Sequence, residues 1–404
     1  MWYSHTAMQK PIQPLGESTN TRAPAALDPF EPGDADRFVL PERWGGNLRP
    51  FEASPPETVC EVEVPSRLHA SVVDMNRFDV GLPGGGGIGF GLALFCRARV
   101  VLRRGAGSEA RGSRRDLALH VTELFRRMTR YDAAIEVELE DHGTRHLGLG
   151  SSIGALTAAA TALNEIFGRP LALRDLRKLV AYNYCEELPG ESRLVPGFET
   201  NVGAMVALHG GMVVASDRCE LLCRTSLPES TRALILLPFL DPRPTSGEKE
   251  AAALLNRARE LDRSDASEKA YRLVMDLLPA MISGDLPAVG EVLFHLTRLG
   301  SKRAECCLHG REGEEIYAAM DRLRTQGAEI VSMSSVGPAV FALSADPQVW
   351  KRWGEWDQPG AAASLLQLPV DNGGARVRLD GVPVPYRREP WWSEPSYRSG
   401  EEHA

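Results

Sequence analysis

The sequence lacks a long hydrophobic run, although it has 404 residues and 43% of them are hydrophobic. No apolar stretch approaches the roughly 20 residues that a membrane-spanning helix needs, and the stretch Ala233–Leu240 is interrupted by Pro238. The N-terminus does not show the charged region followed by an apolar region that is typical of a signal peptide. We therefore expect a cytoplasmic protein that does not act at a membrane.

An excess of positive charge is also missing, and so is an even number of cysteines. Lysine and arginine number 46 against 54 aspartate and glutamate residues, which gives a net charge of −8 and no global field that favours nucleic acid. The seven cysteines include no paired CxxC motif, and we expect reduced thiols that serve as small hydrophobic side chains. A local pocket for a phosphorylated small molecule is compatible with this charge balance.

Proline is concentrated near the ends of the chain. Residues 1–58 hold nine of the 28 prolines and show no sustained hydrophobic period, which predicts a mostly disordered arm with one docked segment near Phe38–Trp44. A similar composition predicts a C-terminal tail over residues 381–404. Between them, alternating strand and helix patterns predict an α+β core over about residues 59–380.

Two glycine-rich motifs in this core are suited to a phosphorylated ligand. Gly148–Gly154 lies between a predicted strand and a predicted helix at Ile153–Phe167, where free N–H groups and the helix dipole attract phosphate. A plain helix start is the alternative interpretation. Pro83–Gly91 has six glycines in nine residues, which predicts either a flexible loop or a backbone wall beside a ligand.

Two further motifs carry hydroxyl and charged side chains. Ser332–Phe341 places hydroxyl groups and a Gly-Pro turn between strand-like flanks, and a surface turn is its alternative interpretation. Pro65–His69, followed by Asp74, places a guanidinium, an imidazole and a carboxylate near the end of a predicted strand. Arginine suits carboxylates and phosphates because it presents a planar fork of donors, although an ordinary surface ion pair has the same composition.

In this order the four motifs resemble those of the GHMP small-molecule kinase superfamily. Gly148–Gly154 is similar to its phosphate loop, and Met333–Phe341 is similar to its C-terminal glycine-rich motif. The resemblance implies an α+β fold of two domains, a ribosomal-S5-like N-terminal domain over 59–225 and a ferredoxin-like C-terminal domain over 226–380. It also implies a homodimer.

The sequence departs from the kinases of that superfamily at two places. Their first motif normally begins with proline and lysine, where this chain has Pro65 and Ser66. They also use an aspartate seven residues before a Gly-Gly pair, and the corresponding residue here is Gly203. Glycine can neither accept a proton nor orient a hydroxyl group. Glu199 is a substitute in principle, but its spacing differs by four residues.

Both departures resemble one branch, the β-ribofuranosylaminobenzene 5′-phosphate synthases, whose motifs are matched by Ser66–His69, Asp74, Gly86–Gly89 and Ser334–Pro338. That resemblance implies a pentosyltransferase that joins phosphoribosyl pyrophosphate (PRPP) to an aromatic carboxylic acid, with Mg²⁺ as cofactor. Carbon dioxide and pyrophosphate are released. Phe198–Asn201 stands where the branch usually has an Arg-Ser-Gly run.

The resemblance also assigns positions in the site. The expected catalytic residues are Arg67 or His69, holding the acceptor carboxylate, and Asp74, orienting His69, a ribose hydroxyl or a metal-bound water. The residues expected to bind phosphate and PRPP are Gly148, Gly150, Ser151, Ser152, Ile153, Gly154, Ser334, Ser335 and Gly337. Those expected to line the substrate are Gly85, Gly86, Gly87, Thr200 and Asn201. No metal ligand is predicted, and the cations expected to be solvated are Lys249, Lys302 and Arg303.

The identity of the acceptor is open. The divergent segment 189–201 and the extra arms favour a heteroaromatic acid, as in C-nucleoside antibiotic biosynthesis. The alternative is 4-aminobenzoate or 4-hydroxybenzoate, as in methanopterin-type cofactor synthesis. Two other classes are an ATP-dependent GHMP kinase with relocated catalytic groups and a non-catalytic ligand-binding protein.

Overall fold

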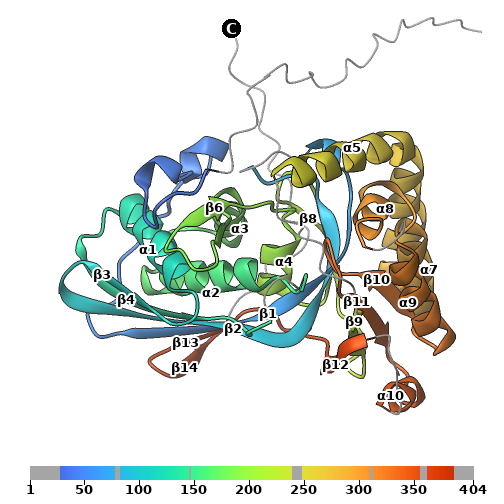
Figure 1. Cartoon of the computed structure of the whole chain (residues 1–404). Coiled ribbons are helices and arrows are strands. Elements are labelled where there is room, and N and C mark those ends of the chain that lie inside the picture. The colour runs from blue at the N-terminus through green and yellow to red at the C-terminus, as the bar shows by residue number, and fades with distance from the viewer. Residues whose placement is uncertain are drawn as a thin grey trace, which may run out of the picture.

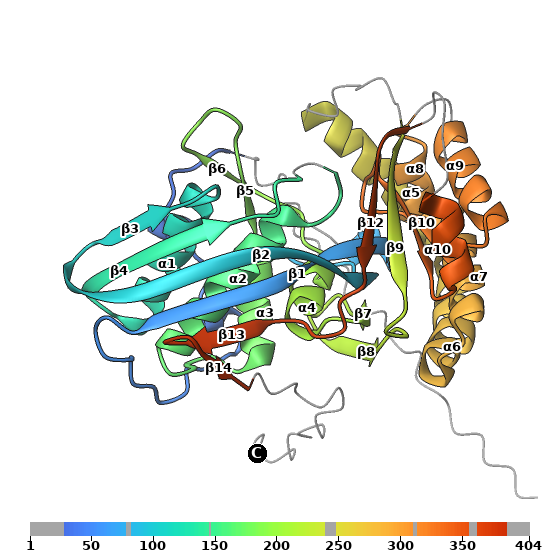
Figure 2. The ribbon, with the colours of Figure 1, turned by 90° about the horizontal axis from the view of Figure 1, so that it is seen from below.

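The computed structural model describes residues 28–77, 82–144, 147–238, 248–309, 313–354 and 362–385. Two units lie side by side, each with a β-sheet and helices packed on it (Figure 1). The view from below shows that the long central strands of the N-terminal sheet reach the C-terminal sheet (Figure 2). The expected α+β fold of two domains is confirmed.

The N-terminal sheet is built around a long antiparallel hairpin. Strands β1 (Val59–Val72) and β2 (Gly87–Ala106) pair over nearly the whole length of β1. The strand order is β14-β13-β1-β2-β4-β3, and β7 pairs with the start of β2 and with β8. The remaining strands are β3 (Ser108–Arg111), β4 (Ala133–Glu140), β7 (Met212–Ala215), β8 (Leu221–Thr225), β13 (Arg376–Leu379) and β14 (Val382–Val384).

Helices cover one face of this sheet (Figure 1), and a two-stranded hairpin stands beside them. The helices are α1 (Arg115–Thr129), α2 (Ser151–Ile166), α3 (Leu173–Tyr182) and α4 (Val202–His209), and the hairpin strands are β5 (Cys185–Glu187) and β6 (Leu194–Pro196). Helix α2 lies at the centre of the layer, and every residue of it except Ser152 is buried. Its many alanines allow this close packing because they present almost no side-chain volume.

The C-terminal domain contains a four-stranded antiparallel sheet in the order β10-β11-β9-β12. Its strands are β9 (Arg232–Pro238), β10 (Ile330–Met333), β11 (Val340–Ser344) and β12 (Ala362–Pro369). Its helices are α5 (Glu248–Tyr271), α6 (Leu278–Ser283), α7 (Leu286–Leu296), α8 (Gly300–Cys306), α9 (Glu314–Thr325) and α10 (Pro347–Gly354), with a π-helical turn at Arg272–Leu277. Phe90 of β2 meets Phe341 of β11 edge to face, with ring centroids 5.9 Å apart, and both belong to one apolar cluster.

The part of the chain before β1 is packed over a longer stretch than expected. Residues 1–27 and 386–404 lie outside the described residues, whereas residues 28–58 pack on the N-terminal domain, which includes the docked segment expected near Phe38–Trp44 and extends beyond it. Phe30 is buried in the core there. Strands β13 and β14 return to the N-terminal sheet, where β13 pairs with β1, so the chain after β12 is not confined to the C-terminal domain.

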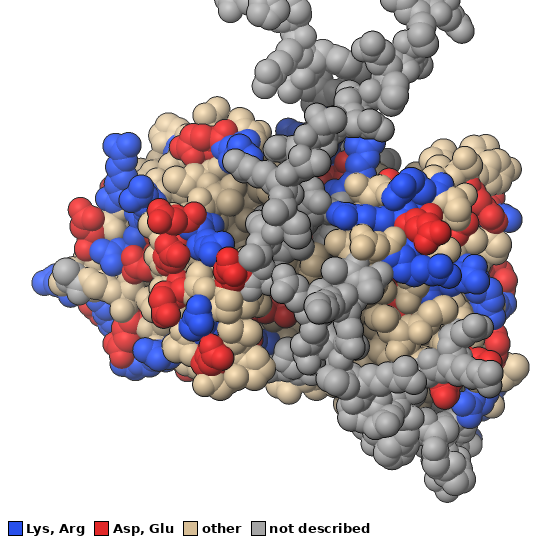
Figure 3. All heavy atoms as spheres, turned by 45° about the horizontal axis from the view of Figure 1, so that its top comes forward, with Lys and Arg blue, Asp and Glu red and all other residues tan. Residues whose placement is uncertain are grey.

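The expectation of reduced cysteines is met by the described residues. All seven cysteines are free thiols, of which six are buried and Cys307 is exposed. Within the described ranges, no helix is long and apolar enough to cross a membrane. Basic and acidic side chains are interspersed over the N-terminal domain on the face drawn in Figure 3.

Candidate functional site

Three of the motifs meet where β1, the start of α2 and the turn between β10 and β11 come together. The Ser334 hydroxyl joins them, because it accepts a hydrogen bond from the backbone N–H of His69 (3.1 Å) and donates one to the carbonyl of Gly148 (2.6 Å). The N–H of Ser335 donates to the carbonyl of His69 (2.9 Å). Residues more than 260 positions apart in the chain therefore form one site.

The fourth motif reaches the same place through its glycines. The N–H of Gly84 donates to the carbonyl of Glu199 (3.1 Å), and a Cβ on Gly87 would lie 2.9 Å from Nε2 of His69. The other predicted wall glycines face the protein's own backbone, since a Cβ on Gly86 would overlap the carbonyl oxygen of Ala215 and one on Gly85 would crowd the carbonyl of Asp74. A ligand-lining role stays a prediction for these three glycines, and Gly87 is the one in contact with the site.

The loop before α2 has the geometry of an anion-binding helix start. Gly148 and Gly150 adopt left-handed φ angles of +75° and +73°, and no side chain caps the helix. The first-turn N–H groups of Ser151, Ser152 and Ile153 have no acceptor within the helix, and the helix dipole makes this end positive. A Cβ on Gly148 would overlap the carbonyl of Ser334, so glycine is required where the two loops touch.

Two other predicted phosphate-loop residues have structural partners. The hydroxyl of Ser151 accepts a hydrogen bond from Arg114 (2.7 Å). Gly154 allows α2 to approach β2, because a Cβ there would be 3.0 Å from Sγ of Cys96. Ser151 could therefore bind a phosphate through its backbone N–H. Ser152 is the α2 residue that is not buried, and its side chain lies near solvent.

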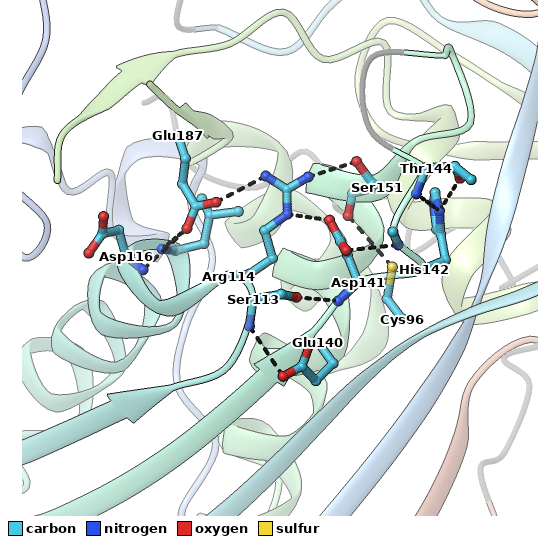
Figure 4. Close-up of polar contacts among 12 residues, drawn as sticks. Cys96, Ser113, Arg114, Asp116, Glu140, Asp141, His142, Thr144, Ser151 and Glu187 are labelled. Carbon is cyan, nitrogen blue, oxygen red and sulfur yellow. Dashed lines mark hydrogen bonds and ion pairs between the residues drawn. The ribbon is translucent and has the colours of Figure 1, made fainter. Parts of the chain in front are cut away.

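A buried ion network, which the sequence did not point to, supports this loop (Figure 4). The guanidinium of Arg114, only 3% exposed, donates to Asp141 (2.7 Å) and Glu187 (3.0 Å) as well as to Ser151. The second oxygen of Glu187 accepts from the N–H groups of Asp116 and Leu117 at the start of α1. One guanidinium thus connects α1, the end of β4, the β5 strand and the phosphate loop.

His69 is buried beneath the meeting point of the motifs, at 2% exposure. Its Nε2 lies 3.1 Å from the hydroxyl of Thr200, and its buried Nδ1 has no hydrogen-bond partner among the described residues. Burial, followed by the positive charges of Arg67 and Lys302, holds the pKa of His69 well below its ordinary value. The imidazole is therefore neutral at pH 7, and its buried Nδ1 keeps an unused hydrogen-bonding position.

Arg67 stands two residues before His69 on β1 and lies under the phosphate loop. Its Nη1 donates to the carbonyl of Gly148 (3.2 Å), and a Cβ on Gly150 would be 2.7 Å from its Cγ. Its buried Nε has no hydrogen-bond partner among the described residues. A guanidinium with unused donors beside a helix N-terminus is suited to an anionic ligand.

Asp74 does not join this group. Its Oδ1 accepts from the backbone N–H and the side-chain amide of Asn76, both at 2.9 Å, which closes a local turn. No contact links Asp74 to His69 within the described ranges. A catalytic role for Asp74 remains a prediction, and its observed bonds explain its position as part of the turn.

The segment before α4 supplies two further side chains. Thr200 contacts His69, as described above, but Asn201 is a structural residue: it adopts a left-handed φ of +68°, donates to the carbonyl of Ser216 (3.3 Å) and accepts from the Cys219 thiol (2.7 Å). In the sequence, Glu199 stands four residues before Gly203, the position of the kinase aspartate. Its carboxylate is 4% exposed and accepts from the N–H of Gly203 at 3.3 Å.

The C-terminal turn rests on a lysine that the sequence suggested would be solvated. Lys302 is completely buried, and its ammonium donates to the carbonyls of Met333 (3.1 Å) and Ser335 (2.7 Å) and pairs with Glu305 (2.6 Å). That expectation was wrong because α8 is packed between α5 and β1, which its sequence does not reveal. Arg303 is exposed as expected, and the side chain of Lys249 lies outside the described residues.

The tip of the same turn needs its glycine. Gly337 has a φ of +80°, and a Cβ there would lie 2.5 Å from Sδ of Met333 and 2.7 Å from Nε2 of His309. Ser335 also adopts a left-handed φ, of +55°, and its N–H bonds to β1. The turn is therefore shaped by its contacts with β1 and α8, and binding of phosphate by Ser334, Ser335 and Gly337 stays a prediction.

Comparison with known proteins finds a matching family model and similar proteins. Residues 116–187 match the family model described as GHMP kinases N terminal domain. A β-ribofuranosylphenol 5′-phosphate synthase from Archaeoglobus fulgidus is 26% identical over 313 residues, covering 71% of this chain and 88% of that protein. A homoserine kinase from Moorella thermoacetica is 26% identical over 311 residues, covering 73% and 95%.

Solved structures show the same fold. A homoserine kinase from Cytophaga hutchinsonii superposes with a TM-score of 0.58 at 17% identity, covering 82% of this chain and 100% of that one. A mevalonate diphosphate decarboxylase from Staphylococcus aureus gives a TM-score of 0.58 at 13% identity, covering 80% and 98%. These structures share the two-domain GHMP architecture with this chain.

Proposed function

We propose that this chain, which belongs to the GHMP kinase superfamily, joins PRPP to a ring carbon of an aromatic carboxylic acid and releases carbon dioxide and pyrophosphate. The observation that carries the proposal is at Gly203, where the superfamily's kinases have an aspartate. A Cβ on Gly203 would lie 2.5 Å from the side chain of Ile153, so no carboxylate fits there. A reaction that loses carbon dioxide instead of a proton from the ring needs no strong base at that place.

A benzoate with a para hydroxyl or amino group is the acceptor best supported by the relatives. A second β-ribofuranosylphenol 5′-phosphate synthase, from Methanothermobacter thermautotrophicus, is also 26% identical to this chain over 296 residues. The product in that enzyme's name is a ribosylated phenol, which 4-hydroxybenzoate would give on losing its carboxylate. The heteroaromatic acid of C-nucleoside biosynthesis, favoured by the sequence, gains no support from these relatives and stays a prediction.

The site residues suit the departure of pyrophosphate. The N–H groups at the start of α2 and the guanidinium of Arg67 would hold the negative charge that develops as the bond between ribose C1 and the pyrophosphate oxygen breaks. The ring carbon that bears the carboxylate forms the new bond to C1 of the ribose. The bond to carbon dioxide then breaks, and its electron pair restores the aromatic ring.

Mg²⁺ is proposed as part of the substrate complex. Among the described residues no group of three His, Cys, Asp or Glu side chains could hold a metal ion, and the two carboxylates that are linked to the phosphate loop, Asp141 and Glu187, are bound to Arg114. Mg²⁺ commonly binds through substrate phosphates and retains several waters. The ion would therefore enter with PRPP and neutralise its pyrophosphate.

Release of both small products tests this function. Purified protein would be incubated with PRPP, Mg²⁺ and each of 4-hydroxybenzoate, 4-aminobenzoate and a pyrazole dicarboxylate, and pyrophosphate and carbon dioxide would be measured together. We expect equal amounts of the two products with at least one benzoate. Phosphoryl transfer from ATP to homoserine, or PRPP binding without pyrophosphate release, would favour the kinase or the non-catalytic alternative.

A further inference from the structure

Lys302 places a positive charge in the interior of the protein. Its side chain is completely buried, and an ammonium group has three N–H donors. These meet the carbonyl of Met333 (3.1 Å), the carbonyl of Ser335 (2.7 Å) and the carboxylate of Glu305 (2.6 Å), which is itself buried. A buried ion pair adds little net stability compared with apolar side chains of similar size. The stability of the fold alone therefore does not account for a lysine at this place.

The two carbonyls that Lys302 holds belong to the residues directly before and after Ser334. Between them, the Ser334 hydroxyl accepts from the N–H of His69 (3.1 Å) and donates to the carbonyl of Gly148 (2.6 Å). Ser335 has a left-handed φ of +55°, which a residue with a side chain rarely adopts. The turn therefore needs bonds that keep it in this shape, and Lys302 supplies two of them.

The helix that carries Lys302 is fixed at its start by α5. The N–H of Ser301 donates to the buried carboxylate of Asp262 (2.7 Å), which is paired with Lys269. The second oxygen of Asp262 accepts from the N–H of Met75 (2.7 Å), just after the end of β1. Helix α8 is thus tied both to α5 and to the segment after β1, so the ammonium holds the turn from a fixed place.

The charge of Lys302 also acts on the site electrostatically. After burial and Arg67, Lys302 is the third cause of the low pKa of His69, so the ammonium lies near the imidazole. Glu305 offsets part of that charge. The start of α2 adds the positive end of a helix dipole at the same junction. This junction favours an anion such as pyrophosphate.

We propose that Lys302 is a positioning residue for PRPP. By holding the carbonyls on either side of Ser334, it fixes the Ser334 hydroxyl between β1 and the carbonyl of Gly148. The phosphate loop is thereby kept in the shape that receives the pyrophosphate group. The lysine acts through Ser334 and does not touch the substrate. This inference rests on the proposed function for the identity of that substrate.

A double-mutant cycle tests this route. Binding of PRPP with Mg²⁺ would be measured by calorimetry for the wild type, Lys302→Met, Ser334→Ala and the variant with both changes, and the KM for PRPP would be measured in turnover. Methionine is close to lysine in length but has no N–H to donate. Lys269→Met is the matched control, because Lys269 is also buried and its loss also leaves a buried carboxylate, that of Asp262, without its cation.

We expect Lys302→Met and Ser334→Ala each to weaken PRPP binding by about 10-fold or more, because small displacements of binding groups have large effects. The variant with both changes should bind no more weakly than the weaker of the two single variants, since the two residues act as one unit. The KM for PRPP should rise in the same order. Lys269→Met should lose as much stability toward urea as Lys302→Met does, yet bind PRPP as the wild type does.

Losses that multiply in the variant with both changes would overturn the proposal, because Lys302 would then act independently of Ser334. Equally weak PRPP binding in Lys269→Met would also overturn it, since the effect would then be one of general stability. If Lys302→Met does not fold, Lys302→Met/Glu305→Met takes its place in the cycle, because removing both charges leaves no unpaired carboxylate. Failure of the proposed function looks different: the wild type would bind PRPP without releasing pyrophosphate with any acid, and the binding comparison would still decide the role of Lys302.

Discussion

Arg67 and His69 are two residues apart on β1, so their side chains face the same side of the strand. We expect Arg67→Ala to lower the rate of pyrophosphate release by about 100-fold or more, as removal of one charge-stabilising donor does, because the N–H groups of the loop alone would then hold the leaving group. Asp74→Asn tests the catalytic role predicted for Asp74, because asparagine preserves the turn by accepting from Asn76 but carries no charge. A rate loss in Asp74→Asn equal to that in Arg67→Ala would place Asp74 in the site.

Arg114 stabilises the folded protein as well as the loop. Arg114→Ala would leave Asp141 and Glu187 buried without their cation, and we expect the free energy of unfolding to fall by about 3–5 kcal/mol. The Michaelis constant for PRPP should rise too, because the Ser151 hydroxyl loses its donor. Urea denaturation and PRPP titration would measure these effects.

The control for that measurement is Arg97→Ala, because Arg97 is 64% exposed and pairs with Glu63 at the surface. Its loss should change the free energy of unfolding by about 1 kcal/mol or less. Equal destabilisation by the two substitutions would contradict the role given to the buried network.

At the scale of elements, the contact between the phosphate loop and the C-terminal turn is the feature that builds the site. Gly148 and Gly143 have the same φ of +75°, but a Cβ overlaps Ser334 only at Gly148 and meets open space at Gly143. Both alanine variants should lose about 1 kcal/mol through backbone strain. Only Gly148→Ala should also lose PRPP binding, measured by calorimetry, and retained binding would show that the loops need not touch.

The segment over residues 28–58 is attached through a histidine that must stay neutral. Nδ1 of His120 accepts the N–H of Gly33 (3.2 Å), and Phe30 and Phe38 pack on its ring. Burial lowers the pKa of His120 to about 4, whereas the unfolded chain has a value of about 6.5. Between these values the unfolded state binds more protons, so this contribution to stability is present above about pH 6.5 and is lost as the pH falls toward 4.

His120→Asn should therefore weaken the acid sensitivity of the protein. Between pH 6 and pH 4.5, its free energy of unfolding should fall less steeply than that of the wild type, by up to about 1.4 kcal/mol per pH unit. Urea denaturation at several pH values measures both slopes. Parallel slopes would mean that His120 takes up its proton equally in the folded and unfolded chains.

Elements with a strong local signature were predictable from the sequence. The helix expected at Ile153–Phe167 appears as α2, directly after the glycine-rich loop that the pattern places before it. The resemblance of the four motifs to one superfamily also predicts that Arg67, His69, Gly148 and Ser334 lie together, and hydrogen bonds join their segments. These features could be predicted because each motif is a short continuous segment, which a local pattern or a family resemblance can identify.

The sequence did not predict which side chains are buried by segments far away in the chain. Arg114 lies in a basic run and Lys302 on a short helix, and each looks solvated until the helices packed around it are known. The spacing of Glu199 does not reveal that its side chain turns back to the N–H of Gly203, because that contact depends on the fold around α4. Residues 28–58 have a disordered composition, but Phe30 is held by β6 and α1, which lie far along the chain.

At the scale of the whole molecule, the site lies on the seam between the two domains. The N-terminal domain supplies the phosphate loop, Arg67 and His69, while the C-terminal domain supplies the turn at Ser334 and its support at Lys302. Ligand sites commonly occupy such seams. The expected homodimer and the cytoplasmic location remain predictions, and a mass of twice 44.1 kDa in solution would establish the first.

The fate of the acceptor's carboxyl carbon tests the central claim most directly. The protein would be given PRPP, Mg²⁺ and 4-hydroxybenzoate labelled with ¹³C either in the ring or in the carboxyl group, and the products would be analysed by mass spectrometry. Decarboxylative ribosyl transfer predicts a ribosylated phenol phosphate that keeps the ring label, with the carboxyl label recovered as carbon dioxide. A ribosylated product that retains the carboxyl label, or labelled acid that returns unchanged while ATP phosphorylates homoserine, would contradict it.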